Sequence, residues 1–404
     1  MNVLYVVGSC LTKNTSANMS HNGYVQGLLE NGCQVDILMA EDSWGAQDAA
    51  LPSWEKATYY CYPSTSFGDL LRKKVRGSFS APATVVTTSS GAGRTASKTT
   101  IKAKIRELVK RVFYMFFPVD PIYPLEKTWL KNASKFKSDT VYDLVISNSS
   151  PAASHKLVGL LLKKNQLNCK RWIQIWEDPW FFDLYGGHSE AIRKEEHMLL
   201  QEASEIYYVS PLTLKYQQQH YSDCANKMKH IPLPYLDFAK TVMEKEDAWS
   251  FGYFGDYYSV TRNLLPFYKA LSSSGYKGFI YGDSELALNA TDKIQVSGRV
   301  TLDVLDRIQA KTKVLVHLCN LRGGQIPGKI YHYCATTKPI LFILDGTPEE
   351  QKILKSYFSQ FNRFYFCENT ADAILEAIRK ITSDSIEWPR VGAFSPKEVV
   401  RQLL

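Results

Sequence analysis

The sequence lacks the features that would place this 404-residue chain in a membrane or in a disulfide-linked, secreted class. No apolar run has the length of a membrane span, and the chain opens on the apolar residues 3–7 without a basic leader or a small-residue cleavage site. The eight cysteines are scattered singly and form no C-x-x-C pair, which favours reduced thiols over disulfides or zinc. We therefore expect a cytoplasmic protein.

The sequence also lacks an even distribution of charged residues along its length. The formal net charge is +8, yet residues 72–111 contain eleven Lys or Arg residues and a single acid, so this segment carries the entire excess. Such confinement differs from the broad basic surface of nucleic-acid-binding proteins. We expect no nucleic-acid partner.

Apolar segments of strand length alternate with helical patterns along most of the chain, which is typical of a parallel α/β architecture. In the first half, strands are expected near residues 2–7, 34–40, 58–62, 143–147, 171–176 and 205–209, and helices near 19–31, 154–164, 189–202 and 211–220. After a charged stretch at 243–247, strands are expected near 250–254, 278–281, 294–297, 314–319, 339–344 and 364–367. We predict two Rossmann-like doubly wound domains that face a cleft, over residues 1–242 and 248–385.

Two adjoining segments of the first half do not fit this pattern. Residues 78–100 are almost all small or polar and cannot bury enough surface to order themselves, which predicts a mobile insertion. Residues 101–117 form a basic amphipathic pattern. One interpretation is a surface helix docked on the N-terminal domain. The other is an interfacial helix that holds the protein peripherally at an anionic membrane, on the inner face of the cell membrane.

The most informative motif is Arg-Gly-Gly-Gln-Ile-Pro-Gly-Lys-Ile-Tyr at residues 322–331, which lies between two apolar strands. Pro327 suits the first position of a helix. The backbone N–H groups of Gly328 and Lys329 would then point out of the helix start, beside a cationic side chain. Such an arrangement favours an anion, so the motif predicts a phosphate site.

Polar residues also follow the expected strands of the first half, where open α/β sheets bind ligands. Glu177 and Asp178 follow strand 171–176, and one carboxylate is expected to orient an acceptor hydroxyl or to aid proton transfer. The alternative is an acid that caps the next helix. Further candidate contacts on this acceptor side are Gly8, Ser9, His21 and Ser149.

In the second half, Gly255 and Arg262 follow the first expected strand. We expect Arg262 at the start of a helix, where the dipole disfavours a cation, so a phosphate contact explains it better than a surface position. Arg299 and Val300 lie in a turn whose backbone groups can pair with a nucleobase edge. The G-x-G-x-x-G fingerprint of nicotinamide and flavin enzymes is absent, and no such cofactor is expected.

With these residues assembled, the chain resembles the retaining glycosyltransferases of family 4, which have the glycosyltransferase B fold, over essentially its whole length. Residues 323–331 are similar to the donor-diphosphate loop and helix of bacterial surface-polysaccharide members. Residues 255–262 resemble the loop that delivers a phosphate-binding cation, and residues 298–300 the turn that holds the nucleobase. Residues 177–180 are similar to an Asp-Pro-Trp element, and residues 386–404 to a last helix that crosses back onto the N-terminal domain.

The resemblance implies a hexosyltransferase that moves a sugar, with retention, from a nucleotide-sugar donor to a carbohydrate or lipid-linked acceptor in polysaccharide or glycan biosynthesis. No metal or cofactor is implied, because cations and a helix start stabilise the leaving diphosphate. The implied donor contacts are Gly255, Arg262, Arg299, Val300, Gly324, Gln325, Ile326, Pro327, Gly328, Lys329 and His332.

The sequence departs from this family at three positions. The paired glutamates of the family fall on Gly324 and His332, neither of which is acidic, and a position that is often arginine is Asp256. His332 is expected to replace one glutamate as a hydrogen-bonding partner of the donor ribose. Two alternatives stay open: a catalytically silent homologue that binds a sugar nucleotide, and a nucleotide-sugar epimerase of the same fold.

Overall fold

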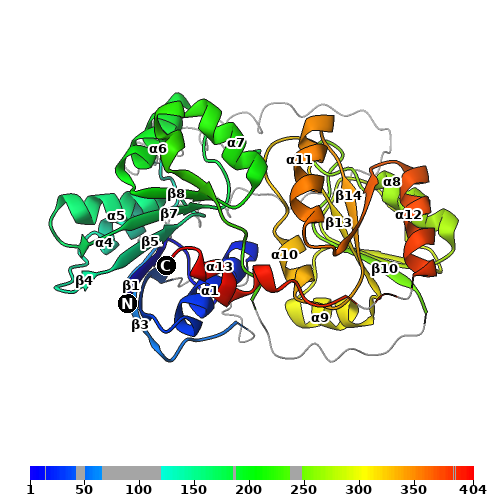
Figure 1. The fold of residues 1–404 in the computed structure, drawn as a ribbon, viewed down its shortest axis with the longest axis horizontal. Helices are drawn as coiled ribbons and strands as arrows, with labels where there is room; N and C mark the ends of the chain where they lie inside the picture. Colours follow the sequence, from blue (N-terminus) through cyan, green and yellow to red (C-terminus); the bar gives the residue numbers. More distant parts are fainter. Residues whose placement is uncertain are drawn as a thin grey trace, which may run out of the picture.

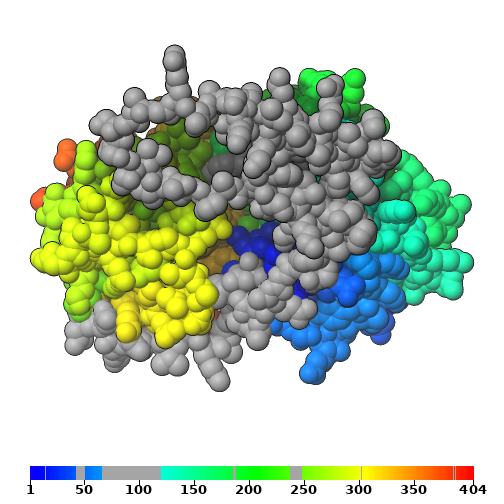
Figure 2. Space-filling view, turned by 180° about the vertical axis from the view of Figure 1, so that it is seen from behind, coloured from blue at the N-terminus to red at the C-terminus, as the bar shows by residue number. Residues whose placement is uncertain are grey.

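The computed structural model describes residues 1–13, 15–41, 51–65, 120–184, 188–236, 248–384, 386 and 388–404. Within them the chain forms two parallel sheets, one in each half of the sequence, with helices around both (Figure 1). Figure 2 shows the two halves from behind, the first in blue to green and the second in yellow-green to orange. The expected insertion at 78–100, the basic segment at 101–117 and the charged stretch at 243–247 lie outside the described residues.

The N-terminal sheet has the order β3-β2-β1-β5-β7-β8-β9. Its strands are β1 (Asn2–Val7), β2 (Gln34–Glu41), β3 (Ala57–Pro63), β5 (Leu144–Asn148), β7 (Trp172–Trp176), β8 (Glu205–Tyr208) and β9 (Met228–His230). The helices of this half are α1 (Ser16–Glu30), α4 (Lys127–Ala133), α5 (Ala153–Lys163), α6 (Glu190–Glu202) and α7 (Pro211–His220). A small second sheet pairs β4 (Val141–Tyr142) with β6 (Asn168–Cys169). The strand order reverses between β1 and β5, and their carboxyl ends form the position where doubly wound sheets bind ligands.

The C-terminal sheet has the order β12-β11-β10-β13-β14-β15 and reverses between β10 and β13. Its strands are β10 (Ser250–Phe254), β11 (Lys277–Tyr281), β12 (Ile294–Ser297), β13 (Val314–Leu318), β14 (Ile340–Leu344) and β15 (Phe364–Glu368). The helices are α8 (Leu265–Ser274), α9 (Leu302–Lys311), α10 (Lys329–Cys334), α11 (Pro348–Ser359) and α12 (Ala371–Ser383). Among the helices in the described ranges, none has both the length and the apolar character needed to cross a membrane.

The twelve expected strands are all present and lie within one residue of their expected bounds, and most of them are nearly continuous apolar runs. The short strands β4, β6 and β9 were not predicted. Strands β10, β13 and β14 are buried along their whole length, as expected for a parallel sheet covered on both faces. Helix α1 starts earlier than expected, since the side chain of Thr15 caps it by accepting from the Asn18 N–H. The eight cysteines all lie in the described part of the chain and none forms a disulfide.

The last helix, α13 (Pro396–Arg401), lies against α1 of the N-terminal half, so the chain ends beside its own beginning (Figure 1). Asn31 Nδ2 donates to the Lys397 carbonyl at 2.9 Å. The Tyr235 N–H donates to the Phe394 carbonyl at 3.1 Å. Gly27 makes the close approach possible, because a Cβ there would stand 2.5 Å from Val400 Cγ2 and nearer still to the Pro396 carbonyl oxygen.

Both halves contribute to one continuous cluster of buried side chains, which includes Tyr5 and Ile146 from the first and Tyr331, Phe342 and Phe394 from the second. Its members meet directly at the boundary. The Tyr331 hydroxyl donates to the Val209 carbonyl at 3.1 Å, and its ring meets that of Phe394 edge to face with centroids 5.0 Å apart. Burial of this contact favours a fixed arrangement of the two sheets.

Substitution of Gly27 by Ala tests the importance of the α1–α13 contact. We expect the free energy of unfolding to fall by about 1–3 kcal/mol, because backbone atoms of α13 must move to admit the methyl group. This loss outweighs the gain of about 1 kcal/mol that Ala brings to a helix. Gly392→Ala is the matched control, since a Cβ there meets nothing within 4 Å. Equal thermal midpoints for the two variants would contradict the packing role of Gly27.

Candidate functional site

Cationic side chains gather at the carboxyl ends of β10 and β13. Burial lowers the pKa of the Lys329 amine to about 8; Arg262 and Arg299 lower it as well, and Asp256 acts against them. Nη1 of Arg262 lies 3.8 Å from the place where a Cβ on Gly255 would stand. The guanidinium of Arg262 thus lies close to the Gly255 backbone, beside the hydroxyl of Tyr253.

Two details of the expected phosphate site are wrong. Arg262 does not begin a helix, since α8 starts at Leu265 and Arg262 lies in the preceding loop, where its N–H donates to the Tyr258 carbonyl at 2.8 Å. The argument from the helix dipole therefore fails for Arg262. Pro327 is not the first helical residue either, because α10 starts at Lys329 with Gly328 at its N-cap.

Arg299 is held by acids on two neighbouring loops. Its Nε lies 3.0 Å from Asp256 Oδ1 and 3.3 Å from Asp283 Oδ2, and its Nη2 also contacts Asp256. Burial acts to raise the pKa of Asp256, but the pairing with Arg299 outweighs it and the pKa lies below its ordinary value. Asp256 thus fixes Arg299 beside the turn at Gly298 and Val300.

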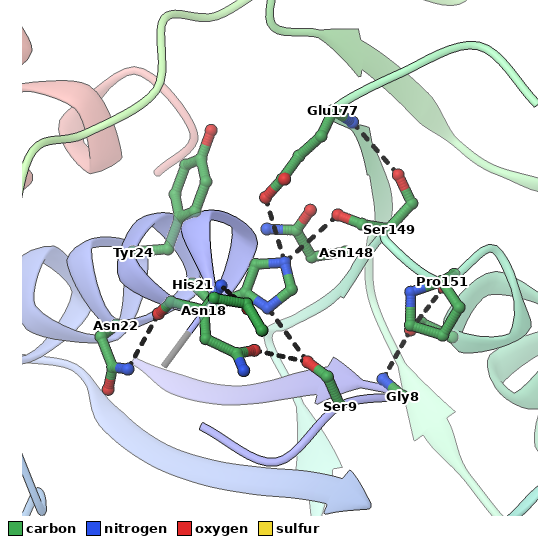
Figure 3. Close-up of polar contacts among 12 residues, drawn as sticks. Gly8, Ser9, Asn18, His21, Asn22, Tyr24, Asn148, Ser149, Pro151 and Glu177 are labelled. Carbon is green, nitrogen blue, oxygen red and sulfur yellow. Dashed lines mark hydrogen bonds and ion pairs between the residues drawn. The ribbon is translucent and has the colours of Figure 1, made fainter. Parts of the chain in front are cut away.

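The N-terminal half places His21 among three loops that follow strands (Figure 3). Its fully buried ring has Nε2 at 3.0 Å from Glu177 Oε1 and at 3.2 Å from the Ser149 carbonyl oxygen. Nδ1 lies 3.5 Å from Ser9 Oγ. The Glu177 N–H donates to Ser149 Oγ at 3.1 Å. The imidazole therefore connects the carboxyl ends of β1, β5 and β7.

The orientation of Ser9 is set by Asn18. The Asn18 amide donates to the carbonyls of Cys10 and Lys13, each at 2.8 Å, so its Oδ1 faces Ser9 and accepts the hydroxyl proton at 2.6 Å. Both nitrogens of His21 consequently face acceptor oxygens.

Glu177 and Asp178 differ in exposure. Glu177 leaves 11% of its side chain accessible, and burial raises its pKa while His21 opposes the rise. The Asp178 side chain is exposed, yet the surrounding protein raises its pKa to about 7. The charge of Asp183 also raises this pKa, whereas a hydrogen bond from Gln325 lowers it. An open side chain with many protein neighbours is typical of a cleft, and Asp178 is the acid that a bound molecule can reach.

The glycine-rich loop contacts the N-terminal half directly. The Gln325 side chain donates to Asp183 Oδ1 at 2.9 Å and accepts from the Leu184 N–H at 3.1 Å. The Gly324 carbonyl accepts from Ser210 Oγ, and a Cβ at 324 would stand 2.6 Å from the Thr213 nitrogen. An acidic residue at 324, as the resemblance would have it, does not fit without moving α7.

Several predicted residues have other roles. The Gly8 N–H donates to Ser154 Oγ at 2.8 Å, and a Cβ on Gly8 would stand 2.7 Å from Pro151 Cγ, so protein rather than a ligand lies against this backbone. Ile326 and Val300 pack against the buried cluster. Burial lowers the pKa of His332 to about 4, with Lys329 acting the same way, which keeps its imidazole neutral near pH 7.

The sequence interpretation missed Asn18, Asp183 and Asp283. Asp283 follows β11 by two residues, so the rule that polar residues after parallel strands face a ligand would have found it. No comparable signal marks Asn18 or Asp183. Among the described residues, the one group of three possible metal ligands is His197, Asp223 and Cys224, none of which belongs to this site.

No protein-family model and no curated protein sequence matches the chain. Solved structures do. A glycosyltransferase from Rickettsia africae is 11% identical with a TM-score of 0.50, covering 99% of this chain and 91% of its own. The UDP-GlcNAc 2-epimerase from Methanocaldococcus jannaschii is 10% identical with a TM-score of 0.50, covering 100% and 99%. At such identities the likeness shows the fold alone: two Rossmann-like doubly wound domains that face a cleft, the glycosyltransferase B fold.

Proposed function

We propose that the protein is a glycosyltransferase that moves a sugar from a nucleotide-sugar donor to a hydroxyl of a glycan or lipid-linked acceptor, as in polysaccharide biosynthesis. The observation that carries this proposal is the meeting of Asp178 with the glycine-rich loop. An accessible carboxyl group with a pKa of about 7 lies beside Gln325, and the same loop leads into Lys329. In this proposal the glycine-rich loop brings an acid–base group and an anion site into one cleft.

The geometry supports a division of roles. Lys329 and Arg262 would stabilise the charge that develops on the departing diphosphate as the bond from the anomeric carbon to the phosphate oxygen breaks. Asp178 would accept the proton of the acceptor hydroxyl while the hydroxyl oxygen bonds to the anomeric carbon, on the face that the diphosphate leaves, as retention requires. Glu177 precedes Asp178 in the chain, and together with His21 it would hold this loop in place through Ser149. These steps ask for no metal.

Retention of the anomeric configuration is part of the proposal and rests on the family resemblance. The lipid-linked acceptor rests on the basic pattern at residues 101–117, which would bring the enzyme to an anionic membrane.

A nucleotide-sugar epimerase is the second candidate. Such chemistry needs several acid–base groups at the cleft, and His21, Glu177 and Asp178 gather in one place. Of these three residues, Asp178 is the exposed one. This favours transfer over epimerisation, because one accessible acid–base group is enough to activate an acceptor hydroxyl.

Incubation with a panel of nucleotide sugars separates these activities. We expect release of the nucleoside diphosphate to require a glycan or lipid-linked acceptor, with an NMR spectrum of the product that shows the donor's anomeric configuration. Isomerised donor without any acceptor would instead identify an epimerase. Binding of nucleotide with neither reaction, for any donor, would identify a silent homologue and contradict the proposal.

Asp178→Asn tests the acid–base role. We expect kcat to fall by about 10²–10⁴-fold, the usual contribution of a general base. In the wild type, kcat/KM should rise with pH through about 7, because the carboxyl group must lose its proton to act as a base. The kcat/KM of the Asp178→Asn variant should not show this rise with pH. Asp139→Asn, at an exposed acid before β4, is the control. A variant with the wild-type rate and pH profile would remove Asp178 from the mechanism.

Substitutions of Lys329 test the phosphate site. Lys329→Ala should weaken binding of a nucleoside diphosphate by about 10²-fold, because a charge-assisted contact is lost. In the wild type, affinity should fall as the pH rises past about 8, where the amine loses its proton. The Lys329→Arg variant should keep its affinity for the nucleoside diphosphate up to higher pH. Lys355→Ala, on the exposed face of α11, is the control for charge, and calorimetry between pH 7 and 8.8 provides the measurement. Binding by Lys329→Ala at wild-type strength would overturn the assignment.

A further inference from the structure

A cavity of about 490 Å³ opens at the carboxyl ends of β11 and β12, next to the phosphate-site cations. Its walls are the residues Tyr257, Gly282, Asp283, Ser284, Leu286, Val296, Ser297 and Gly298. Its lining mixes polar residues with the apolar side chains of Leu286 and Val296, and a cavity of this size can hold a small organic ligand.

Several backbone polar groups around the cavity have partners within the protein. The Gly282 N–H donates to the Ser297 carbonyl at 3.1 Å, and the Asp283 N–H donates to Asp256 Oδ1 at 3.0 Å. The Asp283 carbonyl accepts from the Tyr257 N–H at 3.1 Å. These groups are not available to a ligand, whereas the side chain of Asp283 is.

The Asp283 carboxylate is the charged side chain among the lining residues, and Arg299 holds it in place. Oδ1 accepts from the Arg299 N–H at 3.2 Å, and Oδ2 lies 3.3 Å from Arg299 Nε. Each carboxylate oxygen has two lone pairs, so each retains one for a ligand. Asp283 thus presents two adjacent hydrogen-bond acceptors to the cavity, and it presents no donor.

Arg299 also connects the cavity to the phosphate site. It contacts Asp283 on the cavity side, and its charge is among those that lower the pKa of Lys329. A ligand with a diphosphate at Lys329 would therefore place its base in this direction.

We infer that the cavity binds guanine, with Asp283 as the residue that selects a guanosine-diphosphate sugar as donor. This inference rests on the proposed function and gives its substrate class. Guanine presents two neighbouring donors, N1–H and the N2 amino group, which match the two oxygens of a carboxylate. Uracil presents N3–H between two carbonyl oxygens. Adenine and cytosine present an amino group next to an unprotonated ring nitrogen. In each of these three bases an acceptor would face the carboxylate, an unfavourable pairing that rejects the wrong base.

Inosine diphosphate provides the sharpest probe, because its base differs from guanine only by the missing N2 amino group. We expect calorimetry on the full chain to show GDP binding at least about tenfold tighter than IDP, the value of one hydrogen bond to a charged group. UDP should bind more weakly than GDP by at least the same factor. Asp283→Asn should bring the GDP-to-IDP ratio close to one.

Glu285→Gln is the matched control: this acid lies two residues away, accepts from Ser259 and does not line the cavity. It should keep the wild-type preference. The inference would be overturned if the wild type bound GDP and IDP with equal affinity, which is the result expected if Asp283 contacted the ribose instead. Tighter binding of UDP than of GDP would overturn it as well. Sugar transfer from a uridine-linked donor would leave the proposed function standing while refuting guanine. Failure of all three nucleotides to bind would contradict both.

Discussion

The close packing of Gly324 against the first turn of α7 is the contact on which the rest of the site depends. A hydrogen atom is all that fits between the loop and the Thr213 backbone, and Ser210 holds the Gly324 carbonyl from the same turn. Gln325 consequently reaches Asp183 and Leu184 in the other half. The relative position of the acids and the cations is therefore set by packed backbone rather than by long side chains, which favours catalytic geometry.

The surrounding protein moves the pKa values of two groups, one acidic and one basic, toward the same pH range. It raises the pKa of Asp178 to about 7 and lowers that of Lys329 to about 8, since a partly desolvated site disfavours the ionised form of both. Near neutral pH, a fraction of Asp178 is a base while most of Lys329 is a cation. Perturbed pKa values of this kind are typical of functional sites, and they agree with the proposed roles of Asp178 as a base and of Lys329 as a phosphate ligand.

The sequence was sufficient for most strands of the two large sheets, because fully buried parallel strands such as β10 and β13 are short apolar runs between turns. It was insufficient where a contact joins distant residues. The pairing of His21 with Glu177 and the close approaches at Gly8 and Gly27 depend on tertiary packing that no local pattern reveals. The start of α8 was misplaced although Pro266 in its first turn is a local signal for a helix start at Leu265. The interpretation of residues 78–117 stays a prediction.

A crystal structure of the protein with bound GDP tests the central claim most directly. The account predicts a diphosphate within hydrogen-bonding distance of Lys329 and Arg262, a guanine in the cavity beside Asp283, and an open path from the phosphate to Asp178. A nucleotide bound elsewhere, for example beside Ser9 and His21 in the N-terminal half, would contradict it.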